Sequence, residues 1–317
     1  MRAAILRDFG NDLHLEEIPT PEPKGDELLV RVLGAGVCHT DLHIIDGKIP
    51  NFSLPRILGH EISGYVEGVG NVLVYASWGC GKCRYCRTGE EQLCPAAEEP
   101  GWARDGGYAE HLLVPSRQYL IPLGELDPVR AAPLADAGLT SFRAVRRVRN
   151  FLNGDCDTVV IGAGGLGQFA IQFLKLLTKC RVIAVDREKE KLRWAEELGA
   201  DGVIVWPATL PPARCILDFV GSDETLAQAA SSVERAGVLM VIGEAGGKVP
   251  FGLGRIAHES WFSTSIWGNR SDLASVIAFA QRKEITWRVE ILPLSCINEA
   301  LRRLRDGKIQ GRVVLTP

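Results

Sequence analysis

The feature that most restricts the fold of this chain is a series of short apolar runs in its middle part, separated by helical patterns. The runs, each long enough for one buried strand, lie at residues 158–162, 181–186, 203–205, 215–220 and 238–243. After the second run, apolar Leu192, Ala195 and Leu198 recur at the spacing of one helix face. Strands that alternate with helices predict an α/β fold with a doubly wound parallel sheet.

The loop after the first run, residues 162–167, reads Gly-Ala-Gly-Gly-Leu-Gly and fits the pattern G-x-G-x-x-G. Alone the pattern is weak, but here a strand precedes it and a helix follows it. Gly162 permits the tight turn, Gly164 the approach of a pyrophosphate, and Gly167 close packing of the helix. We therefore predict that a dinucleotide meets the helix N-terminus at Gly162, Gly164, Gly165, Leu166 and Gly167.

The end of the second run predicts which dinucleotide is bound. Asp186 stands there, where a carboxylate accepts hydrogen bonds from the adenosine ribose and repels a 2′-phosphate. The neighbouring Arg187 counts against this, since an arginine at the same place can favour the phosphate. The sequence predicts NAD rather than NADP, with both side chains near the ribose.

The chain before Asp127 has a different pattern, in which short alternating runs are broken by Gly and Pro. Runs at 28–33 and 62–66 predict strands, and no helix is predicted there. Asp127 as N-cap, followed by a proline, predicts one helix over 128–148. Near the C-terminus we expect one further helix and a strand at 312–315 that returns to the first, β-rich domain.

Four cysteines, Cys80, Cys83, Cys86 and Cys94, follow one another as C-x2-C-x2-C-x7-C. Four thiolates at this spacing can close a tetrahedron around zinc and leave no position for a substrate. An iron–sulfur cluster uses similar spacing and is the chemical alternative. Because four free thiols on a loop would be reactive, the sequence predicts a structural zinc site.

Composition excludes several classes of function. The 317 residues carry 36 Lys and Arg against 39 Asp and Glu, a net charge of −3, so no surface for nucleic acid or an anionic membrane is expected. No apolar run is long enough to cross a bilayer. The nine cysteines are an odd number, and the closeness of four of them favours metal binding over a disulfide framework. We expect a reducing compartment, the cytoplasm.

A second set of metal-binding side chains is spread along the chain. Residues 38–43, Cys-His-Thr-Asp-Leu-His, hold a thiol, a hydroxyl, a carboxylate and two imidazoles, and Gly59-His60-Glu61 adds two more candidates. Each is weak by itself, because a lone cysteine or histidine is more often a core residue. Beside a nucleotide fold they indicate a catalytic zinc, which takes three protein ligands and one open position.

With these motifs the chain resembles, along nearly its whole length, the zinc-dependent alcohol dehydrogenases of the medium-chain dehydrogenase/reductase superfamily. The supporting motifs are residues 38–41, 59–61, 80–94, 133–140 and 162–167. The resemblance implies a catalytic zinc held by Cys38, His60 and Asp136, so that with the four cysteines two zinc ions are expected per chain. It also implies oxidation of a primary or secondary alcohol to an aldehyde or ketone by NAD.

The resemblance further implies roles for the neighbouring residues. Thr40 and His43 match a proton-relay hydroxyl and imidazole, Asp41 a carboxylate that orients His60, and Glu61 a residue that can approach the metal. His39 directly follows the ligand Cys38, so we expect its side chain to point away from the metal, toward a cofactor phosphate. The cofactor contacts that the resemblance implies are Arg312 at the pyrophosphate, Thr140 near the nicotinamide and Lys191 at the ribose. Thr140 and Lys191 also have purely structural explanations. Thr140 can hydrogen-bond to its own helical turn, and Lys191 can be a solvated charge on a helix.

The resemblance implies a domain organisation as well. Residues 1–138, with a zinc lobe at about 78–96, would form a GroES-like catalytic domain, residues 139–267 a Rossmann NAD-binding domain, and residues 268–317 a return to the first. A homotetramer or homodimer is expected. The chain is shorter than family members near Gly70, Ala97 and Pro207. Either these loops are deleted or segments are missing from the sequence, and the second is favoured because a deletion near Gly70 would put closure of the barrel in doubt.

The candidate walls of a substrate pocket are Phe52, Trp78, Trp102, Ile266 and Trp267, although a domain-interface core would use the same residues. Such walls favour an apolar or aromatic small-molecule alcohol over a polyol. Two alternatives remain open: another zinc dehydrogenase of the superfamily, acting on a polyol or amino alcohol, and a non-catalytic nucleotide-binding protein with a vestigial site. The complete ligand and relay set argues against the second.

Overall fold

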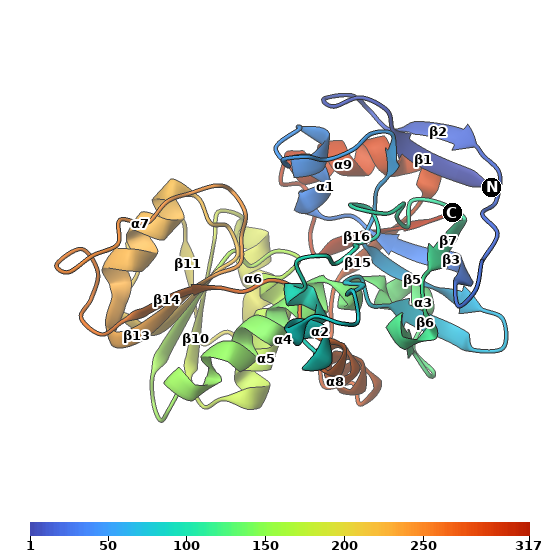
Figure 1. Ribbon diagram of the computed structural model, residues 1–317. Coiled ribbons are helices and arrows are strands. Elements are labelled where there is room, and N and C mark those ends of the chain that lie inside the picture. The colour runs from blue at the N-terminus through green and yellow to red at the C-terminus, as the bar shows by residue number, and fades with distance from the viewer. The chain divides into compact units, whose positions relative to one another are not determined.

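The computed structural model describes residues 1–317 and divides into two compact units, whose elements are labelled in Figure 1. Unit 1 consists of residues 1–139, 268–284 and 288–317, and unit 2 of residues 140–267 and 285–287. The domain bounds predicted from the sequence remain a proposal beside this division.

Unit 1 is built around two β-sheets. The smaller sheet has the strand order β2-β1-β4, and the larger has the order β15-β16-β3-β5-β6-β8, with β7 paired to β3. This confirms the β-rich fold expected for the first domain. The strands are β1 (Arg2–Leu6), β2 (His14–Glu17), β3 (Leu28–Gly36), β4 (Arg56–Ile57), β5 (Glu61–Val66), β6 (Gly70–Val74), β7 (His111–Val114), β8 (Leu120–Pro122), β15 (Val289–Pro293) and β16 (Arg312–Thr316).

The short connection near Gly70 does not interrupt the larger sheet. Val66 of β5 pairs directly with Gly70 of β6 in an antiparallel ladder, so three residues make the turn. Gly68 and Gly70 have φ of 73° and 96°, a conformation that glycine adopts without steric cost. The structure therefore removes the doubt about closure of the sheet at this point.

The prediction of one helix over 128–148 is wrong, because the segment is broken in its middle. Pro133 has no N–H to donate, so a regular helix cannot continue through it. Asp136 has φ −128° and ψ −65°, outside the helical region, and thereby separates the two halves. The pieces are α3 (Pro128–Ala131), the 3-10 turn η3 (Ala132–Ala135) and α4 (Ala137–Val148).

Two further helix predictions need correction. A helix precedes Asp127 where none was expected, α1 (His39–Ile45). Its start is fixed by a reciprocal cap, in which Asp41 Oδ2 in the first turn accepts from the backbone N–H of the N-cap residue Cys38 at 2.9 Å. Two helices occupy the C-terminal part where one was expected, and α9 packs beside α1 (Figure 1). The remaining helices of unit 1 are α2 (Arg84–Arg87), η1 (Glu91–Leu93), η2 (Arg117–Tyr119), α8 (Arg270–Gln281), η5 (Leu294–Cys296) and α9 (Ile297–Arg305).

Unit 2 is a doubly wound α/β fold, as predicted. Its six strands are all parallel to their neighbours in the order β11-β10-β9-β12-β13-β14, which is the order of dinucleotide-binding sheets. The elements are η4 (Arg149–Phe151), β9 (Asp157–Ile161), α5 (Gly167–Leu177), β10 (Arg181–Asp186), α6 (Lys189–Glu197), β11 (Gly202–Val205), β12 (Ala213–Asp218), α7 (Asp223–Ser232), β13 (Val233–Val241) and β14 (Trp261–Thr264).

The crossover from β11 to β12 contains no helix, in line with the shortness noted near Pro207. Trp206 and Leu210 of this loop are buried against Val159, Ile183 and Ile216 of the central strands. A parallel sheet needs apolar cover on both faces. The two loop side chains contribute that cover here.

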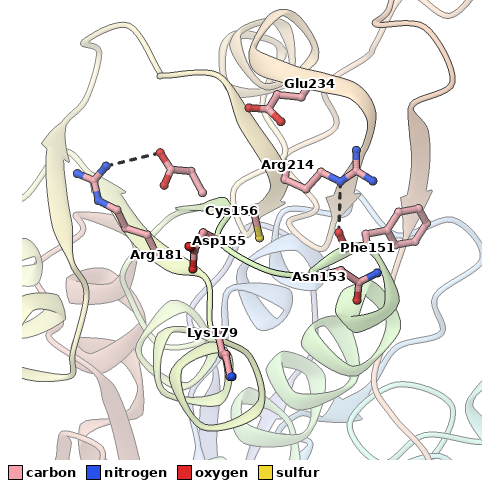
Figure 2. A pocket seen from close by; sticks show the side chains of 9 residues that line it. Phe151, Asn153, Asp155, Cys156, Lys179, Arg181, Arg214 and Glu234 are labelled. Atoms are coloured by element: carbon pink, nitrogen blue, oxygen red, sulfur yellow. Dashed lines mark hydrogen bonds and ion pairs between the residues drawn. The ribbon is translucent and has the colours of Figure 1, made fainter.

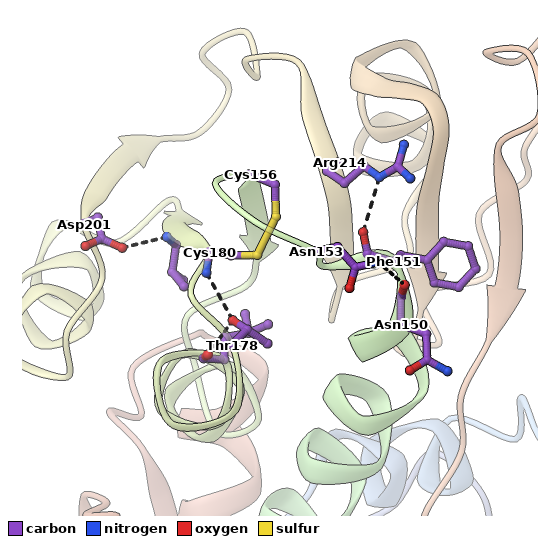
Figure 3. The surroundings of a disulfide bond; sticks show 10 residues. Asn150, Phe151, Asn153, Cys156, Thr178, Cys180, Asp201 and Arg214 are labelled. Atoms are coloured by element: carbon purple, nitrogen blue, oxygen red, sulfur yellow. Dashed lines mark hydrogen bonds between the residues drawn. A yellow bond between two sulfur atoms is a disulfide. The ribbon is translucent and has the colours of Figure 1, made fainter.

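A disulfide joins Cys156 and Cys180, which immediately precede the neighbouring strands β9 and β10 (Figure 3). Their Cα atoms lie 5.0 Å apart, within the range that a disulfide spans. The sequence analysis did not identify this pair, and the other seven of the nine cysteines are free, so the chain has one disulfide and no disulfide framework. None of the helices combines the length and the apolarity that crossing a membrane requires.

Candidate functional site

The larger sheet of unit 1 brings three distant segments together at one end. Strand β3 ends two residues before Cys38, and the antiparallel strand β5 begins directly after His60, with Gly36 opposite Glu61. Strand β16, also antiparallel to β3, begins at Arg312. Cys38, His60 and Arg312 therefore come together at the same end of the sheet. The 3-10 turn η3, which directly precedes Asp136, packs against these strands.

At this end of the sheet Cys38, His60 and Asp136 form a group that we call the buried cluster. Cys38 Sγ lies 3.6 Å and His60 Nε2 lies 3.7 Å from Asp136 Oδ2. Ligands of a tetrahedral zinc, at about 2.0–2.3 Å from the ion, lie about 3.3–3.8 Å from one another. All three side chains are buried and their ligand atoms lie within 4.8 Å of one another. The donor set and its spacing therefore fit zinc.

Asp41 lies beneath His60 and is completely buried. Its Oδ1 is 3.7 Å from His60 Nδ1, and its Oδ2 accepts from Tyr108 Oη at 2.6 Å. A carboxylate on the far nitrogen of a ligating histidine sets the tautomer that leaves Nε2 free for a metal. Burial lowers the pKa of His60, but Asp136, Cys38 and Asp41 outweigh it and raise that pKa above its usual value. Tyr108 escaped the sequence analysis, which contained no signal for it.

Arg312 lies at the buried cluster. Its Nη2 lies 2.6 Å from Glu61 Oε1, 3.3 Å from Asp136 Oδ2 and 3.4 Å from Cys38 Sγ, and the residue is only 3% exposed. Burial raises the pKa of Glu61, and Arg312 opposes this shift. The pyrophosphate contact expected of Arg312 stays a prediction, while its guanidinium group contacts Glu61, Asp136 and Cys38.

Helix α1 carries the two predicted relay residues on one face, because three positions along a helix bring side chains together. Thr40 Oγ1 lies 3.7 Å from Cys38 Sγ, and His43 is half-buried one turn further on. Burial, with Lys48 and Arg305 nearby, lowers the pKa of His43 below its usual 6.5. His39, which precedes both, is exposed.

The four cysteines form a second group, the four-cysteine lobe, which α2 and η1 hold in place. Cys83 Sγ and Cys86 Sγ lie 3.5 Å apart, and Cys80 Sγ and Cys86 Sγ lie 4.0 Å apart. All four ligand atoms fall within 4.8 Å of one another. Backbone N–H groups of Lys82 and Cys83 lower the pKa of Cys80 to about 6, which favours its thiolate.

The glycine loop of unit 2 follows β9 at the carboxyl end of the sheet. Gly162 has φ 90°, and a Cβ on Gly167 would collide with the Gly162 carbonyl, so both positions require glycine. Asp186 Oδ2 accepts from Ala163 N at 2.9 Å, which ties the end of β10 to this loop. Among the other predicted cofactor contacts, Thr140 is buried, Lys191 is half-buried and Arg187 is exposed.

The predicted pocket walls are brought together only in part. Phe52 and Trp102 pack edge to face at 6.4 Å. Trp78 is instead buried against Tyr119, 6.3 Å away, and donates from Nε1 to the Tyr75 carbonyl. Ile266 and Trp267 belong to unit 2.

Unit 2 also contains a hollow of about 670 Å³, whose lining side chains are drawn in Figure 2 and include no residue of the glycine loop. Several of its lining residues lie at the amino ends of β9 and β10, whereas the ligands of such sheets bind at the carboxyl ends of the strands. Its charged residues partly satisfy one another, as Arg181 does with Asp157 at 3.6 Å. The lining residues are Phe151, Asn153, Asp155, Cys156, Asp157, Lys179, Arg181, Arg214 and Glu234.

Comparison with known proteins gives full-length matches. Residues 24–125 match the family model of the alcohol dehydrogenase GroES-like domain, and residues 165–282 match that of zinc-binding dehydrogenases. A D-arabinose 1-dehydrogenase (NADP(+)) from Saccharolobus solfataricus is 36% identical over 100% of this chain and 97% of its own length. An NAD-dependent alcohol dehydrogenase from Sulfurisphaera tokodaii is 37% identical over 100% of both chains. The crystal structure of an alcohol dehydrogenase from Aeropyrum pernix superposes with a TM-score of 0.94 at 36% identity, covering 100% of both chains.

Proposed function

Because the chain belongs to the zinc-dependent alcohol dehydrogenases of the medium-chain dehydrogenase/reductase superfamily, we propose that it transfers a hydride between a small alcohol and NAD, giving an aldehyde or ketone. The observation that carries the proposal is the buried cluster, whose atoms are spaced as zinc ligands in a chain that also has a dinucleotide loop. Relatives named NAD-dependent alcohol dehydrogenases support NAD as the cofactor.

We propose two zinc ions per chain, one at each group of ligands. Zinc at the buried cluster would supply a Lewis acid that acidifies a hydroxyl, and NAD would supply the hydride acceptor. Cys38, His60 and Asp136 leave a fourth tetrahedral position open, whereas the four-cysteine lobe fills all four. The lobe is therefore proposed to be structural.

The chain's own residues then move the proton. The Thr40 hydroxyl, 3.7 Å from Cys38 Sγ, is positioned to accept the proton of the alcohol while it gives up its own proton toward His43, one helical turn further on. Asp41 keeps the Nδ1 side of His60 occupied. In this proposal Arg312, which is paired with Glu61, holds the ligand Asp136 in position through its contact with the Asp136 carboxylate.

The test uses the purified chain loaded with zinc and given NAD. We expect absorbance of reduced nicotinamide to appear with a panel of primary and secondary alcohols, and elemental analysis to give two zinc ions per chain. Absence of turnover with every alcohol would support the non-catalytic alternative, and iron in place of zinc would contradict the assignment of the lobe. Because one relative is named a D-arabinose dehydrogenase, the panel includes polyols and sugars beside apolar alcohols.

We also propose a homotetramer or homodimer in the cytoplasm. Support for association comes from the sheet edge of unit 2, where β14 exposes Trp261 to 64% and the segment before it exposes Phe251 and Leu253 to 75% and 98%. Light scattering after gel filtration tests the oligomer.

The disulfide between Cys156 and Cys180 counts against a reducing compartment. Counting the free thiols of protein taken from intact cells tests whether this disulfide forms there.

A further inference from the structure

Tyr108 is a completely buried side chain of unit 1 to which the mechanism above gives no role. Its hydroxyl donates to Asp41 Oδ2 at 2.6 Å and lies 3.2 Å from the Gly36 carbonyl. A phenol has only one proton to donate, and the shorter contact is with the carboxylate. A distance of 2.6 Å falls in the range of charge-assisted hydrogen bonds, which are stronger than neutral ones. The hydroxyl of Tyr108 therefore serves Asp41.

The backbone around Tyr108 is fixed to the residues that precede His60. The N–H groups of residues 106–108 donate to the carbonyls of residues 57–59, at distances between 2.8 and 3.0 Å. A Cβ on Gly59 would lie 2.7 Å from a ring carbon of Tyr108, so the ring packs directly on the backbone that leads into the ligand. Tyr108 thus joins the segment that carries His60 to the carboxylate that faces the imidazole.

The hydrogen bond from Tyr108 makes the two oxygens of Asp41 different. Oδ2 accepts from the Tyr108 hydroxyl and also from the backbone N–H of Cys38, at 2.9 Å. Oδ1 is buried, has no hydrogen-bond partner in the chain and lies 3.7 Å from His60 Nδ1. Two donors on one oxygen hold the carboxylate in one orientation. The other oxygen is thereby left for the imidazole, where a carboxylate sets the tautomer and raises the basicity of a ligating histidine.

We propose that Tyr108 is a positioning residue for the metal of the buried cluster. By holding Asp41 Oδ2, its hydroxyl directs Oδ1 at the imidazole of His60 and so strengthens zinc binding at the cluster. A phenylalanine would pack against the same backbone but could not donate, so the hydrogen bond is what the tyrosine adds. The inference rests on the proposed function, because it concerns the zinc that would bind the alcohol there.

The test measures zinc affinity by competition with a chromophoric chelator, on the chain without NAD. Asp136→Ala lacks one ligand of the buried cluster and keeps all four cysteines of the lobe, so it identifies which part of the titration belongs to which group. We expect Tyr108→Phe to weaken zinc binding at the buried cluster roughly 10-fold, the lower end of the range for groups that surround a metal ligand. Binding at the four-cysteine lobe should not change.

Tyr75→Phe is the matched control for the loss of one buried hydroxyl. Tyr75 is also completely buried, and its hydroxyl donates to the Gly268 carbonyl at 2.9 Å. This variant should leave zinc affinity at the buried cluster unchanged. If a variant unfolds without zinc, its affinity follows from the rise of the thermal midpoint with zinc concentration, because a ligand that binds the folded chain stabilises it according to its dissociation constant.

A double-mutant cycle tests whether the hydroxyl acts through Asp41. Asp41→Asn should itself weaken zinc binding at the cluster by about 10- to 100-fold. In that background Tyr108→Phe should add no more than about a 2-fold loss, because no carboxylate is left to position. Losses that multiply as if they were independent would overturn the proposed route through Asp41.

Unchanged affinity of the buried cluster in Tyr108→Phe, or an equal loss in Tyr75→Phe, would likewise overturn the role of Tyr108 while leaving the proposed function intact. A wild-type chain that binds zinc only at the four-cysteine lobe would instead contradict the proposed function, and the positioning role with it.

Discussion

The two groups of metal ligands differ in how they are assembled. The four-cysteine lobe takes its ligands from residues 80–94, a single local segment, and three of its four cysteines are partly exposed. The buried cluster takes its ligands from the end of β3, the start of β5 and the break before α4, and all three are buried. One group can therefore form from local sequence, whereas the other exists only when unit 1 is folded.

The difference extends to the charges around each group. Two anionic ligands, Cys38 and Asp136, would balance a dication, while four thiolates exceed it by two. The buried cluster also has its own buried ion pair, Glu61 with Arg312. The lobe has a counterpart in Glu91 with Arg270 at 2.5 Å, in which the arginine side chain is 34% exposed. A buried ligand set needs its charges compensated within the protein, because water does not reach it.

The largest effect should come from separating the two groups by mutation. Asp136→Ala removes one of three ligands at the open site, and we expect turnover to fall to background, one zinc ion to be lost, and the thermal midpoint to stay nearly constant. Cys83→Ser should instead lower the midpoint by roughly 5–10 °C, a loss of several kcal/mol, with kcat changed less. Kinetics, metal analysis and calorimetry on both variants decide this, and the comparison fails if the two variants show the same profile.

The two ion pairs, Glu61 with Arg312 and Glu91 with Arg270, should also differ in how much they contribute to the free energy of unfolding, with the buried pair contributing more. Glu61→Gln removes the shortest of the carboxylate contacts of the buried Arg312 and should cost about 3 kcal/mol in the free energy of unfolding, since Asp136 at 3.3 Å compensates only part of the charge. Glu91→Gln should cost less, about 1–3 kcal/mol, because Glu91 is buried but its partner Arg270 is 34% exposed and can be hydrated. Urea denaturation of zinc-loaded protein measures both. Equal costs would show that burial does not distinguish the two regions.

Mutation of His43 tests whether burial near the cluster also changes the pH dependence of the proposed proton relay. Because its pKa is lowered, His43 stays neutral and able to accept a proton as the pH falls through 6.5, so the acid limb of alcohol oxidation should lie below that pH. His43→Gln should slow oxidation by about 100-fold or less and remove this limb, with small external bases restoring part of the rate. Lys48→Met should move the limb upward, since it removes a positive charge.

His39→Gln is the matched control, and it should raise the KM for NAD while leaving the limb in place. A limb that moves with His39 and not with His43 would reverse the assignment.

The smallest effect concerns unit 2, which lies outside both groups of ligands. Asp186→Gly removes the acceptor for Ala163 N and for the ribose, and we expect kcat/KM for NAD to fall about 10-fold and that for NADP to rise. Zinc content should not change. Wild-type protein that uses NADP as well as NAD would show that Asp186 does not select the cofactor.

The sequence alone was enough to predict several features that depend on local spacing. The four-cysteine pattern, the glycine loop and the parallel sheet all follow from residues near one another, because a metal tetrahedron, a tight turn and a strand each extend over a few residues. The motifs also led to the correct family. Spacing could not show that the segment at 128–148 breaks, since the apolar pattern continues through Pro133.

The tertiary structure decided which distant side chains meet. Arg312 and Tyr108 reach the buried cluster only because distant segments of the chain meet at one end of the sheet. Burial, too, is a property of the folded chain, and it lowers the pKa of His43 and raises that of Glu61. A sequence specifies the types of its side chains, whereas their distances and exposure to water, which determine their chemistry, arise from packing.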